Sequence, residues 1–134
     1  MLGLVNADHE ESSPDASLLL ISKLSCSLVG EKRAVRILPG SQAHRIYGQD
    51  FAVEAFACNY GLNEAFRNKI SSSDLRISGS DDEGAVRIVE LPRHRFFIAT
   101  LYVPQVLSKP GSPHPLITAY LREAYAFSRV RARA

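Results

Sequence analysis

The sequence predicts an α/β domain, and three observations lead to this prediction. Two apolar runs suited to β-strands, residues 86–91 and 96–102, are separated by turn-forming residues at 92–95. Residues 116–129 instead space their apolar side chains as one face of a helix does. With 134 residues, of which 46% are hydrophobic, the chain suffices for a single domain, 1–134, with a real core.

The run at 96–102 is the most apolar of the expected strands. Its nearly uninterrupted hydrophobic character is typical of a strand that is buried on both faces. It leads directly into Val103, Pro104 and Gln105. Because ligands collect at the carboxyl ends of strands in open α/β sheets, the sequence predicts that any functional site includes this loop.

Composition excludes several classes of protein. The 16 basic and 14 acidic side chains give a net charge of only +2, which implies no bulk nucleic-acid partner. No run approaches membrane-spanning length and no signal peptide is recognisable, so the expected location is the cytoplasm, away from membranes. Cys26 and Cys58 are expected as reduced thiols, and the scattered histidines predict neither a metal site nor a cofactor.

The remaining elements follow from local patterns along the chain. Ser41 is expected to cap a short helix that Gly48 ends, and Asn63 to cap the next helix, whose inner face includes Ala65. Within the first long apolar run, Cys26 is expected as a small buried hydrophobe. The expected strands span residues 17–28, 32–38, 51–59 and 74–79, and the expected helices span 42–47 and 63–70.

Two polar connections and the chain start complete the prediction. Residues 1–7 are interpreted as a short strand or lead-in, followed by a polar loop at 8–15. Residues 80–84, Ser-Asp-Asp-Glu-Gly, form a hairpin connection. Three consecutive acids suggest calcium, but they lack the alternating oxygen ligands of an EF-hand, so a solvated turn is favoured.

Residues 86–116, VRIVELPRHRFFIATLYVPQVLSKPGSPHPL, resemble the last part of the class I glutamine amidotransferase domain of the CTP synthase family. Both show a Glu-Leu-Pro turn, an apolar strand, a loop, and a His-Pro-Leu, here beginning at His114, that opens the final helix. The resemblance implies a flavodoxin-like layered sheet with flanking helices. The family's N-terminal strands and its Gly-x-Cys-x-Gly nucleophile elbow have no counterpart in these residues, and neither does its synthetase domain.

The family's catalytic loop reads aromatic-His-Pro-Glu, where the histidine is the base for a cysteine nucleophile and the glutamate orients it. The same places here are Tyr102, Val103, Pro104 and Gln105. Valine has no nitrogen that accepts a proton, and a neutral amide does not stabilise an imidazolium as a carboxylate does. The resemblance therefore implies that no catalytic residue is intact and that glutamine is not hydrolysed.

Two further positions correspond to the family's glutamine pocket. Glu11 matches a glutamate that contacts the amino group of bound glutamine, although it is equally explained as a loop residue that water solvates. Asn59 stands where the family has an arginine that holds the carboxylate of glutamine, and an amide does not replace a bidentate guanidinium. A degenerate pocket of Glu11, Asn59, Val103 and Gln105 is thus expected to accept a small amine-bearing ligand, such as glutamine, or none.

These residues leave alternative functions open. The favoured one is a non-catalytic binding or interaction module in a family tied to the biosynthesis of pyrimidine nucleotides, here CTP. The second is a cysteine-dependent enzyme of altered chemistry that uses Cys58, unless this cysteine is an inert strand residue. The third is a remnant of a longer amidotransferase, whose unpaired sheet edge would favour a homodimer or a second chain that supplies the missing half.

Overall fold

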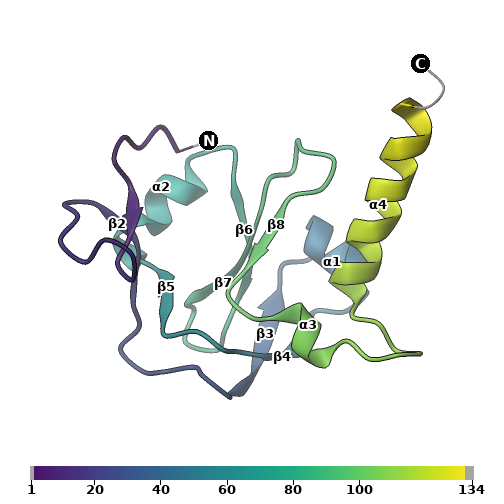
Figure 1. Cartoon of the computed structure of the whole chain (residues 1–134), viewed down its shortest axis with the longest axis horizontal. Helices are drawn as coiled ribbons and strands as arrows, with labels where there is room; N and C mark the ends of the chain where they lie inside the picture. The colour runs from purple at the N-terminus through teal and green to yellow at the C-terminus, as the bar shows by residue number, and fades with distance from the viewer. Residues whose placement is uncertain (1, 132–134) are drawn as a thin grey trace.

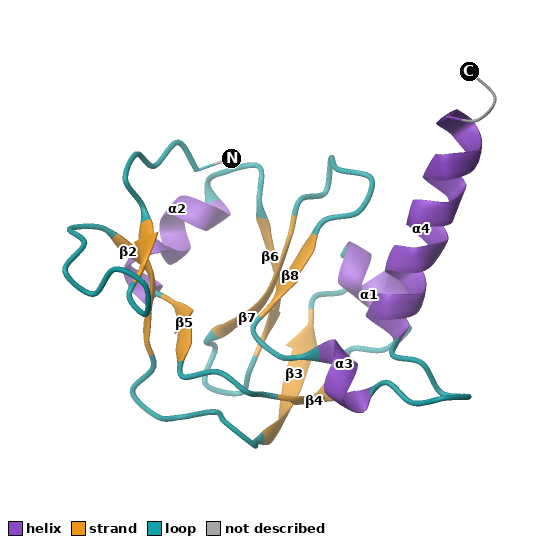
Figure 2. Cartoon of the chain, viewed as in Figure 1, coloured by secondary structure: helices purple, strands orange, loops and turns teal. Residues whose placement is uncertain are grey.

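Residues 2–131 of the chain, as described by a computed structural model, form two β-sheets with helices beside them (Figure 1). The larger sheet has the strand order β4-β3-β6-β7-β8, and the smaller one has the order β1-β2-β5. In the view of Figure 2, helices α1, α3 and α4 lie on one side of the larger sheet, and α2 and the smaller sheet lie on the other. The predicted α/β architecture with flanking helices is confirmed.

The elements have the following bounds. The strands are β1 (Asp8–His9), β2 (Leu19–Lys23), β3 (Lys32–Ile37), β4 (Phe51–Ala55), β5 (Tyr60–Leu62), β6 (Arg76–Ser80), β7 (Val86–Glu90) and β8 (Ile98–Thr100). The helices are α1 (Gln42–Tyr47), the 3-10 turn η1 (Glu64–Phe66), α2 (Arg67–Ser71), α3 (Pro104–Leu107) and α4 (Pro115–Arg131). No helix within residues 2–131 is long and apolar enough to cross a membrane.

Neighbouring strands of the larger sheet all run antiparallel. Apolar side chains from its strands, from α1 and from the start of α4 form one core beside it. The buried members of this core are Leu28, Val35, Ile37, Ala43, Ala52, Phe56, Ile88, Tyr102 and Leu116. Because the core joins the end of β8 to the start of α4, it fixes the 102–105 loop between them.

Helix α1 begins and ends where the sequence predicts. The Ser41 hydroxyl accepts a hydrogen bond from the backbone N–H of His44 at 2.9 Å, and Gly48 adopts a φ of 68°, which glycine tolerates without strain. A long-range contact is added by the buried Glu90 carboxylate of β7. It accepts hydrogen bonds from the N–H groups of Gln42 and Ala43, at 3.1 Å each, and so satisfies donors at the helix start.

The expectation that the 96–102 run is buried on both faces is wrong. Only Ile98–Thr100 are in a strand, Ala99 is exposed, and Ile98 is half-buried. The physical reason is that only one face of β8 is covered, because Ile98 packs against the core whereas Ala99, which points to the opposite face, is exposed. β8 is also the last strand of the sheet and pairs with β7 on one side only. The turn at 92–95 lies where expected.

Near the chain start, the strands are shorter than their apolar runs. Of residues 17–28 only Leu19–Lys23 pair, and Cys26 is exposed rather than buried. Residues 2–7 contain no strand, Asp8–His9 pair with β2 instead, and Met1 lies outside the described residues. The small sheet offers backbone partners over only a few residues, so the remaining apolar positions form loops.

Three other boundaries also differ from expectation. The strand expected at 51–59 ends at Ala55, which leaves Cys58 and Asn59 in the connection to β5. The helix expected at 63–70 divides into η1 and α2, with Ala65 exposed although Asn63 caps it as predicted. The last helix extends to Arg131, and residues 132–134 of the basic tail lie outside the described part.

The apolar face predicted for the last helix is present, but the body of the protein covers only its beginning. Leu116 is buried, whereas Tyr120 and Leu121 are 57% and 59% exposed. Ala124 is exposed and Phe127 is 46% exposed, so neither is buried as a packed helix face would be. Figure 1 shows the reason, since the C-terminal part of α4 extends beyond the larger sheet.

Candidate functional site

The 102–105 loop is held at its start by the core and by β4. Tyr102 is buried, and the backbone N–H of Val103 donates a hydrogen bond to the carbonyl oxygen of Ala55 at 2.9 Å. Pro104 then begins α3, which suits a residue that has no N–H to donate. The loop conformation is therefore defined although Val103 and Gln105 bring no ionisable group to it.

Glu11 and Asn59 lie on neighbouring segments around the small sheet. The carbonyl oxygen of Asn59 accepts a hydrogen bond from the N–H of Leu24 at 2.8 Å. The ring of His9, whose Nδ1 accepts a hydrogen bond from the N–H of Glu11, lies 5.1 Å from the ring of Tyr60. Both Glu11 and Asn59 are exposed.

The other two nominated side chains are placed differently. Gln105 is exposed and lines a groove between β8, α3 and α4, which Glu11 and Asn59 do not line. Cys58 is half-buried, and its carbonyl oxygen accepts a hydrogen bond from the N–H of Leu28. The nominated residues thus line no single cavity described within residues 2–131.

Behind the loop lies a buried polar cluster that the sequence did not reveal. We call Tyr47, Glu54, Tyr102 and His114 the Glu54 cluster. The Glu54 carboxylate is 2% exposed and accepts hydrogen bonds from the Tyr47 hydroxyl at 2.5 Å and from His114 Nε2 at 3.1 Å. The Tyr47 and Tyr102 hydroxyl oxygens are 2.9 Å apart.

The protonation of His114 follows from its two ring nitrogens. Nδ1 accepts a hydrogen bond from the N–H of Leu116 at 3.2 Å, so the proton of the neutral ring lies on Nε2 and points at Glu54. The sequence places His114 at the helix start, and the structure agrees. The structure adds that this imidazole is 5% exposed and forms a hydrogen bond with Glu54. Together with Tyr47 and Tyr102, this contact joins β4, α1 and the 102–105 loop to the start of α4.

Burial raises the pKa of Tyr47 and of Tyr102 well above the ordinary tyrosine value of 10.0. For Tyr47, the negative charge of a neighbouring ionised Tyr102 and the hydrogen bond to Glu54 act in the same direction. Both hydroxyls therefore stay protonated in the folded chain, so that Tyr47 donates to the Glu54 carboxylate and Tyr102 donates to the Tyr47 hydroxyl.

This protonation predicts a loss of stability in alkali. Because the pKa is raised in the folded state, the stabilisation is complete below pH 10 and is lost as the pH rises further. Each buried tyrosine contributes a slope of up to about 1.4 kcal/mol per pH unit. Urea unfolding between about pH 8 and 11 should show this slope, and Tyr47→Phe should reduce it. Tyr125→Phe, at a 63% exposed position, should leave the slope unchanged.

One signal in the sequence could have revealed the Glu54 cluster. Ala52, Glu54 and Phe56 alternate along the chain at and just after β4, and all three are buried. Glu54 thus stands in a row of inward positions that is otherwise apolar. A carboxylate at an inward strand position requires hydrogen-bond donors. The sequence does not identify these donors, because Tyr102 and His114 are far from Glu54 along the chain.

The acidic connection at 80–84 is a second polar centre and corrects the expectation of a purely solvated turn. Asp81 is buried, and its Oδ2 accepts from Arg87 Nε at 3.0 Å and from Arg87 Nη2 at 2.6 Å. Its Oδ1 accepts from the N–H groups of Glu83 and Ala85. Within residues 2–131 no group of three histidine, cysteine or acidic side chains is placed to hold a metal ion.

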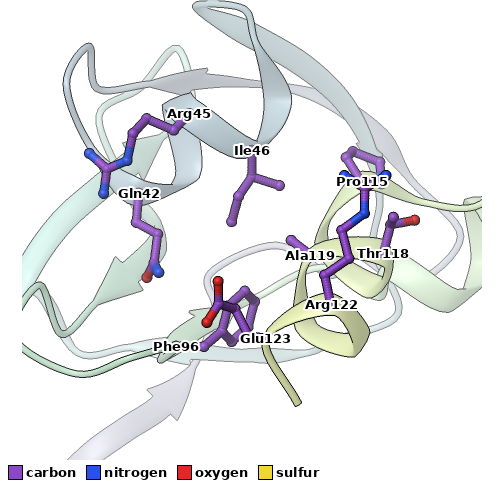
Figure 3. A pocket seen from close by; sticks show the side chains of 9 residues that line it. All are labelled: Gln42, Arg45, Ile46, Phe96, Pro115, Thr118, Ala119, Arg122 and Glu123. Atoms are coloured by element: carbon purple, nitrogen blue, oxygen red, sulfur yellow. The ribbon is translucent and has the colours of Figure 1, made fainter. Parts of the chain in front are cut away.

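A cavity of about 420 Å³ lies between α1 and α4 (Figure 3). Arg45 and Arg122 lie on opposite sides of it, and Glu123 and Phe96 also line it. The Gln42 amide nitrogen donates to the carbonyl oxygen of Arg95, while its buried oxygen has no hydrogen-bond partner in the described part of the chain. None of the residues expected from the sequence to form a site lines this cavity.

No family model matches the sequence, whereas curated proteins do. It is 38% identical over 134 residues to the CTP synthase of Synechococcus sp. (strain WH7803), an alignment that covers 92% of this chain and 25% of that protein. It is 34% identical over 148 residues to the CTP synthase of Rhodospirillum centenum, covering 97% of this chain and 27% of that protein. The chain therefore spans about a quarter of the length of these relatives.

Two solved structures share the fold of this chain. The glutaminase domain of Trypanosoma brucei CTP synthase, with bound acivicin, matches with a TM-score of 0.85 at 24% identity, over 93% of this chain and 53% of that one. A Thermoplasma acidophilum protein of the GMP synthase type matches with a TM-score of 0.61 at 12% identity, over 84% and 51%. We conclude that the chain is related in sequence to the CTP synthases and has the fold of a class I glutamine amidotransferase domain, about half of which it spans.

Proposed function

We propose that this chain is a non-catalytic glutamine amidotransferase-like module, which accepts a small amine-bearing ligand such as glutamine and does not hydrolyse it. The observation that carries the proposal is the pair Val103 and Gln105, which occupy the places of the base and of the residue that orients it. Neither side chain takes up a proton from a nucleophile at neutral pH.

The remaining histidine near the loop does not supply a substitute base. His114 is buried, and both of its ring nitrogens are engaged, one by Glu54 and the other by a backbone N–H. Of the two cysteines, Cys26 is exposed beside a different cavity and Cys58 is half-buried. This arrangement supports a binding role over a hydrolytic one.

The proposed ligand contact uses Glu11. Glu11 is exposed, and His9 of the same segment contacts the ring of Tyr60, the residue that follows Asn59. A carboxylate in this place suits the ammonium group of an amino acid. Asn59 offers a single amide in place of a guanidinium, so the carboxylate end of glutamine is held weakly. We therefore expect modest affinity with no turnover.

The proposal is tested by incubating the purified chain with glutamine and measuring both binding and chemistry. Calorimetry should detect glutamine binding, and Glu11→Gln should weaken it by about 10-fold or more, as expected for the loss of a charged hydrogen bond. Release of glutamate and ammonia should not exceed the rate in buffer.

Asp15→Asn provides the matched control, because Asp15 is an exposed acid of the same loop and the substitution removes the same charge. It should leave glutamine binding unchanged. Hydrolysis of glutamine by the chain would contradict the non-catalytic role. Failure of glutamine to bind, or equal weakening by both substitutions, would contradict the ligand contact.

A further inference from the structure

The cavity between α1 and α4 is a polar cavity that the proposed function does not use (Figure 3). Its walls come from these two helices and from Phe96, which precedes β8. Ala43 of α1 and Leu116 of α4 belong to one buried core, so the fold of this chain holds the two helices together. The volume of about 420 Å³ lies within the range of about 300–1,000 Å³ that small-molecule sites have.

Two arginines on opposite sides of this cavity supply its positive charges. The Arg45 guanidinium donates to the carbonyl oxygen of Gly40 at 3.2 Å. The Arg122 guanidinium has neither a hydrogen bond nor an ion pair within residues 2–131. A guanidinium binds a carboxylate through two parallel hydrogen bonds, so two such groups on opposite walls suit a molecule that carries two carboxylates.

The same lining also offers hydrogen-bond acceptors. Glu123 lines the cavity, and its carboxylate approaches Arg95 only to 3.8 Å, which is beyond hydrogen-bond distance. The Gln42 amide nitrogen donates to the carbonyl oxygen of Arg95, whereas the covered amide oxygen has no partner within the described residues. The terminal torsion of glutamine is soft, so a small rotation lets this oxygen accept from a ligand. Together these acceptors suit an ammonium group, which donates up to three hydrogen bonds.

We propose that the cavity between α1 and α4 binds a free acidic amino acid, aspartate or glutamate. The two carboxylates of the amino acid contact Arg45 and Arg122. Its ammonium group contacts Glu123 and the oxygen of Gln42. The lining thus presents two positive charges and one negative charge, and an acidic amino acid carries the complementary set.

This site is separate from the proposed glutamine contact. Neither Glu11 nor Asn59 lines the cavity between α1 and α4. The acidic amino acid therefore binds whether or not glutamine binds at Glu11, and the two proposals are tested independently.

The test compares each amino acid with the diacid that lacks only the amino group. In calorimetry with the full chain, L-aspartate should bind about 10-fold or more tightly than succinate, or L-glutamate than glutarate, because only the amino acids supply a donor to the acceptors. In NMR spectra, the bound amino acid should shift the backbone amide signals of residues 42–46 and 115–123. An amino acid bound only at the proposed glutamine contact would instead shift the signals of residues 9–11.

Three substitutions in α4 test the assigned contacts. Arg122→Gln should weaken binding of the amino acid by about 10-fold or more, because it removes a charged two-pronged contact. Arg131→Gln removes the same charge at an exposed position of α4 that does not line the cavity, and should change binding by less than about twofold. Glu123→Gln should weaken the amino acid but strengthen the diacid, because it removes a charge that attracts ammonium and repels carboxylates.

Circular dichroism of each variant verifies that α4 remains folded, and the opposite responses to Glu123→Gln are not expected from a general loss of structure. Four results would each overturn the proposal. They are no binding of either amino acid at about 10 mM, equal affinities for the amino acids and their diacids, signal shifts confined to residues 9–11, and equal effects of Arg122→Gln and Arg131→Gln.

Discussion

Replacing Glu54 by alanine is expected to lower the free energy of unfolding by about 3–5 kcal/mol. The substitution removes the only carboxylate of the Glu54 cluster and leaves the Tyr47 hydroxyl and the His114 Nε2–H without their acceptor in a buried place. Each unsatisfied buried donor costs about 1–3 kcal/mol, and the cavity adds to this loss. Urea unfolding of the purified variant measures the effect.

The control for Glu54→Ala is Glu31→Ala. The carboxylate of Glu31 is 51% exposed and 3.9 Å from Arg33 Nε, so its removal should change stability by less than about 1 kcal/mol. Glu54→Gln keeps one acceptor oxygen and should fall between the two. If Glu54→Ala is no more destabilising than Glu31→Ala, the cluster does not hold the loop and α4 together as described.

The second large effect is expected at Asp81. Asp81→Ala leaves the Arg87 guanidinium buried without its carboxylate and removes the acceptor of the Glu83 and Ala85 N–H groups. Breaking a buried ion pair on one side typically costs about 3–5 kcal/mol. Arg87 also lies over the Phe56 ring at 5.6 Å, so the disturbance should reach the core. Thermal unfolding followed by circular dichroism should show a strongly lowered midpoint.

The neighbouring acid provides a matched comparison for this variant. Asp82 is exposed and pairs with Arg36 at 3.0 Å on the surface, where both side chains are well solvated. Asp82→Ala should therefore alter stability by less than about 1 kcal/mol. Similar losses for Asp81→Ala and Asp82→Ala would mean that the buried pair contributes no more than the surface pair does.

These two clusters have different relations to the candidate site. The Asp81–Arg87 pair stabilises the β6–β7 connection, whereas the Glu54 cluster contains Tyr102, the first residue of the 102–105 loop. Under the proposed function, the loop is thus supported by a buried cluster, while neither Val103 nor Gln105 acts on a substrate. Loss of Glu54 should therefore weaken folding without creating or removing hydrolysis.

What the sequence determines by itself is mostly local. Ser41 and Gly48 define α1 because their capping contacts involve residues no more than four positions away. That Val103 and Gln105 bring no ionisable group to their loop is likewise readable from the residues, and so is the relationship to the amidotransferase domain. These conclusions depend on residue type and on neighbours in the sequence, so they do not require the tertiary structure.

The tertiary structure decided what depends on distant partners. His114 and Glu54 are 60 positions apart, and only the tertiary structure, which brings the residue before α4 next to β4, turns two ordinary-looking residues into a buried pair. Likewise, the apolar pattern of α4 shows that one face seeks burial, but not what covers it, because periodicity describes a single helix and exposure depends on its neighbours. The burial of β8 has the same origin, since whether both faces of a strand are buried depends on the elements that cover them rather than on its own apolar content.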